Sequence, residues 1–240
     1  MNWDGIISLL IASIEALLLI NLIIFVDKNK VNIFTLLIVF LLASYQFFEF
    51  LICNQNFNQP FHIYLAFSTI TIIPVLNFLM INRILQFHER KFFLSLEIIF
   101  ILSGLFFIIY YGMNLNLFKV VKCTVFYATY NYPLGFLYGL FYYAPILISF
   151  LLLFKSFQKS EDNRFRNQLR ILLIGYVFII TPPLTGFGLK FLGMTGLLNS
   201  MESILCKFAF FYAISISIFS LITSNFKDER NYLKYLSGYK

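Results

Sequence analysis

The sequence predicts an all-α, polytopic membrane protein, a bundle of seven transmembrane helices. Of its 240 residues, 60% are hydrophobic and 12% are charged, whereas a soluble domain is about half apolar and a quarter charged. The apolar residues gather in segments of about 20, the length at which a helix crosses a hydrocarbon core of roughly 30 Å. Strand alternation is absent, and the apolar runs are too long for the strands of a membrane barrel.

Seven apolar segments are the expected helices, and together they form one domain over residues 1–226. The first is not a cleavable signal, because MNWD offers no basic residue and the apolar run continues to Val26. A polar tail, 227–240, closes the chain. The expected helices cover residues 5–26, 33–53, 61–82, 92–112, 134–154, 169–191 and 203–224.

The basic residues predict how the bundle is oriented. Alternate connections and the tail carry 14 of the 18 Lys and Arg residues. By the positive-inside rule, the N-terminus lies outside and the C-terminus in the cytoplasm, as an odd number of helices requires. The +7 net charge then reflects topology and attraction to a membrane surface, so we expect the lipid bilayer and no nucleic acid as a partner. The 14 residues are Lys28, Lys30, Arg83, Arg90, Lys91, Lys155, Lys159, Arg164, Arg166, Arg170, Lys227, Arg230, Lys234 and Lys240.

Prolines and glycines predict irregular helices and close packing. Pro74 and Pro145 each remove a backbone donor within an expected helix. In the sixth helix, Pro182–Pro183 are followed by two glycines, so its second half is expected to be kinked or partly unwound. Gly135 and Gly139 form a GxxxG pattern, which permits a close approach of helix backbones. Plain helix packing and a hinge or cavity wall at helix six both fit this pattern.

Ionisable residues inside membrane spans are candidates for function, because each needs a partner or a wet cavity. Glu49 lies one turn before the outer end of the second helix, and Lys207 lies at the same depth in the seventh. If these helices are neighbours, the two charges can form an ion pair. It could be structural, or the two side chains could line a polar ligand pocket open to the outside.

Two further glutamates lie deeper. Glu15 is near the middle of the first helix, where a carboxylate is most costly, so we expect it to face the bundle interior. Glu97 lies about a turn and a half inside the cytoplasmic boundary and could bond Asn77 at similar depth. For both residues a structural role is favoured over catalysis.

The three cysteines, Cys53, Cys123 and Cys206, all map to the outer end of the bundle. An oxidising compartment allows a disulfide there, most simply Cys53–Cys123 or Cys123–Cys206. His62 also lies outside, but no CxxC or HxxxH spacing accompanies it, so no metal site is predicted.

Sequence signatures of enzymes are absent. The chain has no HExxH, no GxSxG and no glycine-rich nucleotide loop, and its two histidines fall on opposite sides of the membrane. We therefore predict that the protein is not an enzyme and needs no cofactor.

Three stretches carry a resemblance to a known class of protein: ASYQFFEFLIC (43–53), HIYLAFSTITIIPVLNFLM (62–80) and YGLFYYAPILISFLLLFKSFQKSEDNRFRNQLRILLIGYVF (138–178). They resemble the seven-helix membrane sensor modules at the N-termini of some prokaryotic histidine kinases and cyclic-dinucleotide enzymes. In that family, a basic loop and an Arg/Gln-rich helix start follow the fifth helix, as RFRNQLRIL does here. The chain ends at Lys240 with no output domain, so the resemblance implies a receptor-like module with a separate partner.

The sequence thus predicts a sensor or receptor-like protein of a prokaryotic cell membrane, binding a small or lipophilic ligand in an outward-facing cavity. Candidate ligand-binding residues are Glu49, Lys207, His62 and Glu15. A cytoplasmic signalling partner is expected at the 155–170 loop and the tail, and the sequence leaves the oligomeric state open. The alternative is a transporter or channel-like component with a polar path through Glu15, Glu49 and Lys207.

Overall fold

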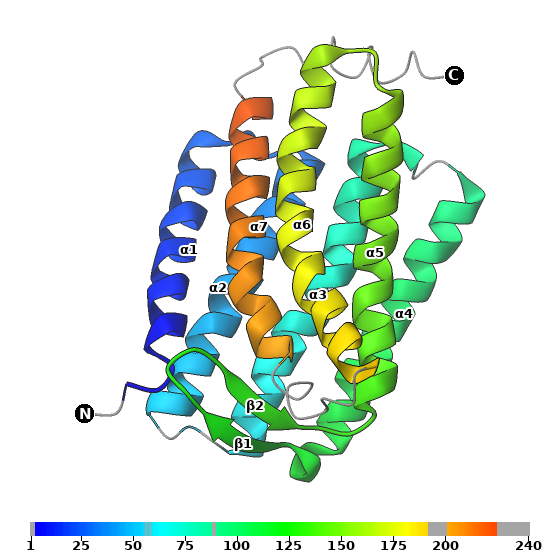
Figure 1. Ribbon diagram of the computed structural model, residues 1–240. Coiled ribbons are helices and arrows are strands. Elements are labelled where there is room, and N and C mark those ends of the chain that lie inside the picture. Colours follow the sequence, from blue (N-terminus) through cyan, green and yellow to red (C-terminus); the bar gives the residue numbers. More distant parts are fainter. Residues whose placement is uncertain (1–2, 56, 58, 88–89, 192–200, 225–240) are drawn as a thin grey trace.

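The computed structural model describes residues 3–55, 57, 59–87, 90–191 and 201–224, and for residues 186–191, 201 and 202 it describes the backbone alone. It is a bundle of antiparallel helices, shown in Figure 1. All seven long helices of the described residues are long and apolar enough to cross a membrane, which is the architecture of a multi-pass membrane protein. They are α1 (Ile6–Phe25), α2 (Lys30–Asn54), α3 (Pro60–Ile84), α4 (Lys91–Met113), α5 (Gly135–Lys159), α6 (Asn163–Phe191) and α7 (Met201–Ser224).

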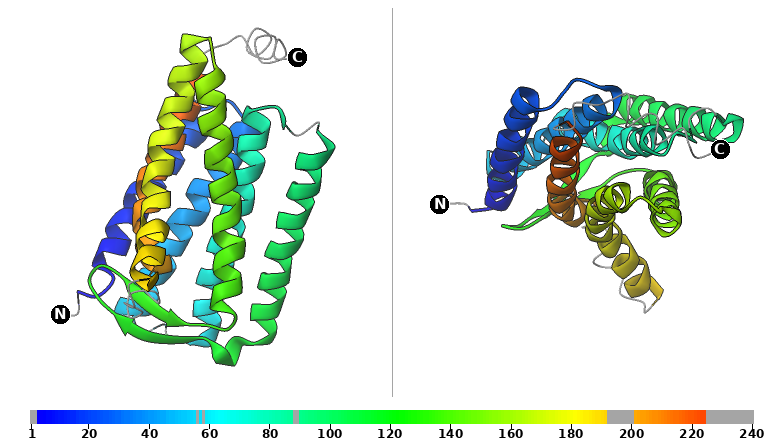
Figure 2. Two further views of the ribbon diagram at one scale, coloured as in Figure 1. Left: turned by 45° about the vertical axis from the view of Figure 1, so that its right-hand side comes forward. Right: turned by 90° about the horizontal axis from the view of Figure 1, so that it is seen from above.

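The helices pack side by side, and α3 is the most buried of them. α1 contacts α2 and α7, and α2 also contacts both α3 and α7. On the other side, α3 contacts α4 and α5, and α6 joins α5 to α7. The view from above in Figure 2 shows α1 and α4 at opposite edges of the molecule. The expected contact between the second and seventh helices is therefore present.

α5 and α6 extend beyond their apolar segments. α5 continues through Lys155 to Lys159, and α6 starts at Asn163, six residues before the expected start. Only 160–162 remain as a connection, and Figure 1 shows this end of the pair projecting above the neighbouring helices. Hydropathy falls where the charged residues begin, but the hydrogen bonds of a helix do not depend on hydropathy. The apolar segment therefore underestimates the length of the helix.

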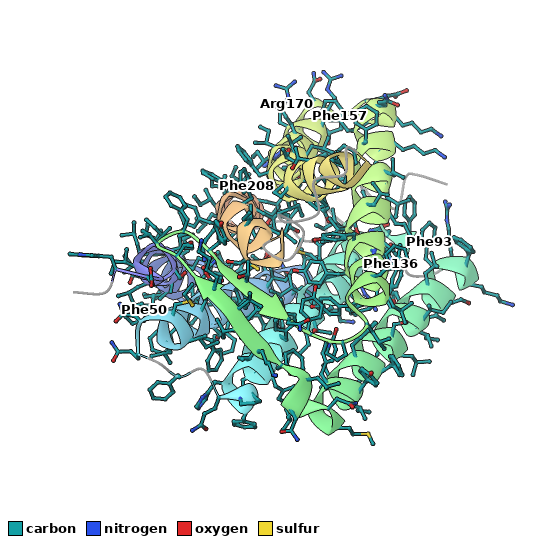
Figure 3. All side chains as sticks on the ribbon, turned by 60° about the horizontal axis from the view of Figure 1, so that its bottom comes forward. Phe50, Phe93, Phe136, Phe157, Arg170 and Phe208 are labelled. Carbon is teal, nitrogen blue, oxygen red and sulfur yellow. A yellow bond between two sulfur atoms is a disulfide. The ribbon has the colours of Figure 1, made fainter. Side chains whose placement is uncertain are left out.

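A β-hairpin closes the opposite end of the bundle, which we call the hairpin end. After the 3₁₀ helix η2 (Leu115–Leu117), strand β1 (Lys119–Cys123) pairs antiparallel with β2 (Ala128–Asn131). Figure 3, viewed toward this end, shows the hairpin running across it, with α2 on one side and α7 on the other. The predicted all-α class is confirmed, and the hairpin is a feature that the sequence did not reveal, because two strands this short carry too few residues to establish an alternation.

Aromatic packing fixes the hairpin and η2 to the helices. The ring of Phe67 on α3 meets those of Phe118 and Tyr130 edge-on, with centroids 5.3 and 5.5 Å apart. Tyr111 on α4 packs edge-on against Phe67 as well, at 6.2 Å. Such pairs each stabilise a fold by about 0.5–1.5 kcal/mol beyond their buried area. The hairpin is therefore part of the core of the protein.

Two expectations about helix packing have different outcomes. The second half of α6 is kinked, since its ribbon changes direction in this part (Figure 1), but the helix continues past Pro182–Pro183 to Phe191 without unwinding. A Cβ added at Gly139 would meet only the ring of Tyr143 on the same helix, so the GxxxG pattern makes no close helix contact in the described chain. The close approach occurs at Gly175 on α6, where an added Cβ would lie 2.7 Å from the Cβ of Ser215.

Candidate functional site

The first helix begins directly over the end of the second. Gly5 has φ +74°, and its N–H donates to the Thr124 carbonyl in the hairpin turn at 3.0 Å. A Cβ on this residue would lie 3.2 Å from the Cβ of Cys53 and 3.3 Å from the Cα of Phe50. Both the backbone conformation and the close approach require glycine here. The arrangement brings the first turn of α1 beside Glu49.

Glu49 and Lys207 form a buried ion pair. The Lys207 Nζ lies 2.6 Å from the Glu49 Oε1, and the two side chains are 11% and 1% exposed. Side chains of α1, α2 and α7 complete the hydrogen bonds around it. We call this set the Glu49 cluster: Ser8, Gln46, Glu49, Ser203 and Lys207.

Lys207 uses all three of its donors within the Glu49 cluster. Besides Glu49, it donates to the Ser8 Oγ at 2.8 Å and to the Gln46 Oε1 at 2.7 Å. Gln46 in turn donates from its Nε2 to the carbonyl of Cys206 at 2.8 Å. An ammonium group has three donors and no acceptor, so this one is fully satisfied by the protein.

The Glu49 carboxylate is likewise bonded at both oxygens. Its Oε1 accepts from Ser8 at 2.9 Å as well as from Lys207, and its Oε2 accepts from Ser203 at 2.9 Å. A buried ion pair repays its desolvation only when its remaining hydrogen-bonding capacity is met in this way. The cluster therefore holds one positive and one negative charge in a closed network that joins three helices.

The hairpin covers the Glu49 cluster and is linked to it. The backbone N–H of Ala128 on β2 donates to the Ser203 Oγ at 3.1 Å, and Ser203 donates onward to Glu49. Burial, and after it the nearby Glu49 carboxylate, raises the pKa of Tyr130 on β2 well above its ordinary value, so its phenol stays protonated. The hairpin thus places a neutral hydroxyl, rather than a charge, above the carboxylate.

A disulfide fixes the hairpin to α2. Of the two pairings left open by the sequence, the structure forms Cys53–Cys123, which joins residues 70 apart in the chain. Cys53 is one helical turn after Glu49, so the covalent link lies directly beside the cluster. Cys206 is a buried thiol outside this disulfide, and its carbonyl is the acceptor for Gln46.

The other predicted site residues lie apart from this network. Glu15 is fully buried on α1, and both its carboxylate oxygens lack a hydrogen-bond partner. His62, at the start of α3, packs its ring against Phe57 and Phe61 and does not contact the cluster. Within the described part of the chain, no three His, Cys, Asp or Glu side chains come together as a metal site.

The expected partner of Glu97 is wrong. Its Oε1 accepts from the amide of Asn82 at 3.1 Å, rather than from Asn77. Long helical side chains point back toward the N-terminus of their helix. On α4 this direction leads toward the α3–α4 connection, and Asn82 lies closer to that connection than Asn77 does.

Asn77 instead binds two tyrosines near the middle of the bundle. Its Oδ1 accepts from the hydroxyl of Tyr176 on α6 at 2.9 Å and from the hydroxyl of Tyr212 on α7. Its Nδ2 is buried without a hydrogen-bond partner. We call these three residues the Asn77 group. It joins three helices, as the Glu49 cluster does, but without a formal charge.

A row of polar contacts, which we call the α2–α7 seam, connects the hairpin end with the opposite end. Thr35 accepts from Ser220 at 3.0 Å, and the Asn32 amide donates to Ser224 at 3.0 Å. In two antiparallel helices, residue numbers rise along one helix as they fall along the other. These contacts and the Glu49–Lys207 pair have nearly the same sum of residue numbers, so they all belong to one register. A shift of α7 along α2 would therefore disturb contacts at both ends.

A groove of about 440 Å³ lies elsewhere, between α4 and α5. Its lining is apolar apart from Ser103 and includes Phe106 and Leu140, both exposed on the outside of the bundle. The groove is separate from the candidate site residues named above.

Three members of the Glu49 cluster were not predicted from the sequence: Ser8, Gln46 and Ser203. Helical spacing could have found two of them, because Gln46 lies three residues before Glu49 and Ser203 four residues before Lys207. Residues three or four apart share one face of a helix. Ser8 has no such neighbour in sequence, and only the packing of α1 brings it to the pair.

In comparisons with protein-family models, curated proteins and solved structures, the chain matches none of them.

Proposed function

We propose that the protein is a membrane sensor module that receives a small or lipophilic ligand at its hairpin end and signals to a separate partner at the other. One observation carries the proposal: the hairpin, α1, α2 and α7 meet in a single hydrogen-bonded cluster, and α2 and α7 make further polar contacts in the same register near their other ends. A change at the hairpin can thereby reach the far end of the bundle.

In the proposed orientation, the hairpin end lies outside the cell membrane. The connections at the opposite end carry most of the basic residues, as expected for the cytoplasmic side. A disulfide at the hairpin end suits an oxidising compartment. The signalling partner would meet the projecting α5–α6 connection (155–170) and the tail (227–240).

The proposed stimulus acts by competing for the bonds of the Glu49 cluster. Every donor of Lys207 is already taken, and Glu49 is almost fully buried. A ligand with an acceptor group that reaches Lys207 must therefore replace at least one bond between helices. Because those bonds fix α1, α2 and α7 together, ligand binding and a change in helix packing are the same event.

The test measures whether the hairpin end controls the opposite end. Spin labels at Lys28→Cys and Glu161→Cys, both exposed positions, report distances there in a Cys206→Ala background. Ser203→Ala removes the link between the hairpin and Glu49, and we expect it to shift the measured distance distribution. Ser217→Ala is the matched control, because Ser217 bonds only within its own helix, to Ala213. Identical distributions in all of these proteins would rule out the proposed relay.

A transporter is the second candidate, and Glu15 favours it. A buried carboxyl group without a hydrogen-bond partner, on the same helix as Ser8, could extend a polar path inward from the Glu49 cluster. Liposomes that contain the protein and an internal pH-sensitive dye distinguish the two functions. The sensor predicts no proton flux above protein-free liposomes, whereas a flux that Glu15→Gln abolishes would establish transport.

A further inference from the structure

Glu15 differs from the other buried carboxylates of the described chain. It is fully buried, like Glu49 and Glu97, but neither of its oxygens has a hydrogen-bond partner. Glu49 has a lysine and two serines, and Glu97 has an asparagine amide. A buried polar group without a partner calls for an explanation, because it loses its hydration without compensation.

The position of Glu15 relates it to the Glu49 cluster. Glu15 lies seven residues after Ser8, so the two share a face of α1 and are separated by about 10 Å along the helix axis. Its side chain is directed back along α1, toward the hairpin end. Lys207 donates to Ser8, so its ammonium lies against the face of α1 that also carries Glu15.

The groups around Glu15 supply one cation for two carboxylates. α1 packs against α2 and α7. Among the buried side chains that the structure describes, the charged or titratable groups on α2 are Glu49 and the phenol of Tyr45. On α7 they are Lys207, the thiol of Cys206 and the phenol of Tyr212. Tyr130 of the hairpin lies above them as a neutral phenol. If both carboxylates were ionised, this part of the bundle would hold a net charge of −1, away from water.

We propose that Glu15 is a proton-binding site coupled to the Glu49–Lys207 pair, so that the two carboxylates share one proton and one ammonium. In the first arrangement Lys207 bonds Glu49, as in the structure, and the shared proton is on Glu15. In the second arrangement the proton leaves the Glu15 oxygen and binds a Glu49 oxygen, while Lys207 turns from Glu49 to Glu15. Lys207 remains an ammonium throughout, and the total charge and number of protons are unchanged.

The two placements of the proton would give the proposed sensor its two states. Only the claim that the change between them is a signal rests on the proposed function. A ligand that displaces the Lys207 ammonium from Glu49 toward Glu15 would move the proton from Glu15 to Glu49, because one carboxylate is then paired and the other neutral. The protonation states can be measured whether or not the protein signals, so failure of one claim is distinct from failure of the other.

The experiment counts protonated carboxyl groups by infrared spectroscopy. The protein is prepared at neutral pH in a detergent without carbonyl groups, and ¹³C-labelled glutamate identifies the carboxylic-acid band of Glu side chains. We expect Glu15→Gln to lose one carboxylic-acid equivalent per protein. We expect Glu49→Gln to lose one as well, because Lys207 then pairs with Glu15, which ionises. Lys207→Met should gain one, since neither carboxylate then has a cation.

Two controls complete the test. Ser13→Ala removes a hydrogen bond on the same helix, to the Leu9 carbonyl, outside the Glu49 cluster, and should leave the band unchanged. Glu97→Gln measures the contribution of the remaining buried glutamate, which is subtracted. An unchanged band in Glu15→Gln would show that Glu15 is ionised and overturn the proposal. If the band decreased in Glu15→Gln but not in Glu49→Gln, the proton on Glu15 would not be coupled to Lys207. This result would also overturn the proposal. If Lys207→Met does not fold, the two glutamine variants decide the question.

Discussion

The Glu49 cluster and the Asn77 group each join three helices through buried polar side chains, but with different chemistry. The first lies at the hairpin end, contains an ion pair, and is fixed by a disulfide one turn away. The second lies near the middle of the bundle and uses an amide and two phenols. Charge is tolerated where the hairpin and helix ends supply additional partners, and neutral groups serve in the middle, where an unpaired charge costs most.

The largest difference between the two regions should appear when one charge of the pair is removed. Lys207→Met leaves Glu49 buried without its cation, and we expect a loss of about 3–5 kcal/mol in the free energy of unfolding. Reversible denaturation in mixed micelles measures it. Lys122→Met, at an exposed position on β1, is the matched control and should change stability by less than about 0.5 kcal/mol. Equal effects of the two substitutions would contradict a buried pair.

The disulfide should contribute next. Replacing Cys53 and Cys123 together by serine opens a loop of 70 residues, and we expect a loss of about 2–4 kcal/mol. Amide exchange should quicken in β1 and β2 more than in α3, because the hairpin loses its link to α2. Reduction of the native protein should reproduce both effects. Unchanged exchange in the strands would show that the disulfide does not fix the hairpin.

Close packing beside the Asn77 group gives the third prediction. An added methyl group at Gly175 would lie 2.7 Å from the Ser215 Cβ, so Gly175→Ala should cost about 1–3 kcal/mol by overpacking. At Gly139 the nearest atom of another residue is 3.8 Å away, on the Tyr143 ring, so Gly139→Ala should be neutral or stabilising because alanine is the better helix former. Equal destabilisation at both positions would contradict the assigned α6–α7 contact.

The smallest effect is expected within the Asn77 group itself. Tyr212→Phe removes one hydrogen bond to the Asn77 Oδ1 and keeps the ring, which packs against Tyr176 with centroids 5.2 Å apart. Hydrogen bonds between membrane helices contribute about 1 kcal/mol or less, so the loss should be of that size. Tyr176→Phe is the matched variant and should cost a similar amount. A loss as large as that of Lys207→Met would remove the distinction between the two regions.

The sequence predicted the helices well because long apolar segments directly reflect the thickness of a bilayer. It ended α5 too early and began α6 too late, since Lys155 and Arg164 are polar yet remain helical. It did not predict the hairpin, whose β1 and β2 have five and four residues. Local patterns are informative about long elements and much less so about short ones.

For the site, depth within the membrane identified the Glu49–Lys207 pair, because two charges at one level in neighbouring helices have few other partners. Depth alone did not predict the partner of Glu97, because the direction of its side chain brings it to Asn82. The Asn77 group could not be predicted, since tyrosines are frequent in this chain and nothing local distinguishes Tyr176 and Tyr212. Contacts that depend on helix rotation need the packed structure.

The central claim is that Glu49 and Lys207 stabilise each other as a closed pair at the hairpin end. A double-mutant cycle of Glu49→Gln, Lys207→Met and the double variant, with the disulfide intact, tests it most directly. We predict that the double variant loses less stability than the sum of the two single variants, by about 2–3 kcal/mol, because it leaves no unpaired buried charge. Additivity within about 0.5 kcal/mol would show that the two residues are energetically independent and would contradict the account.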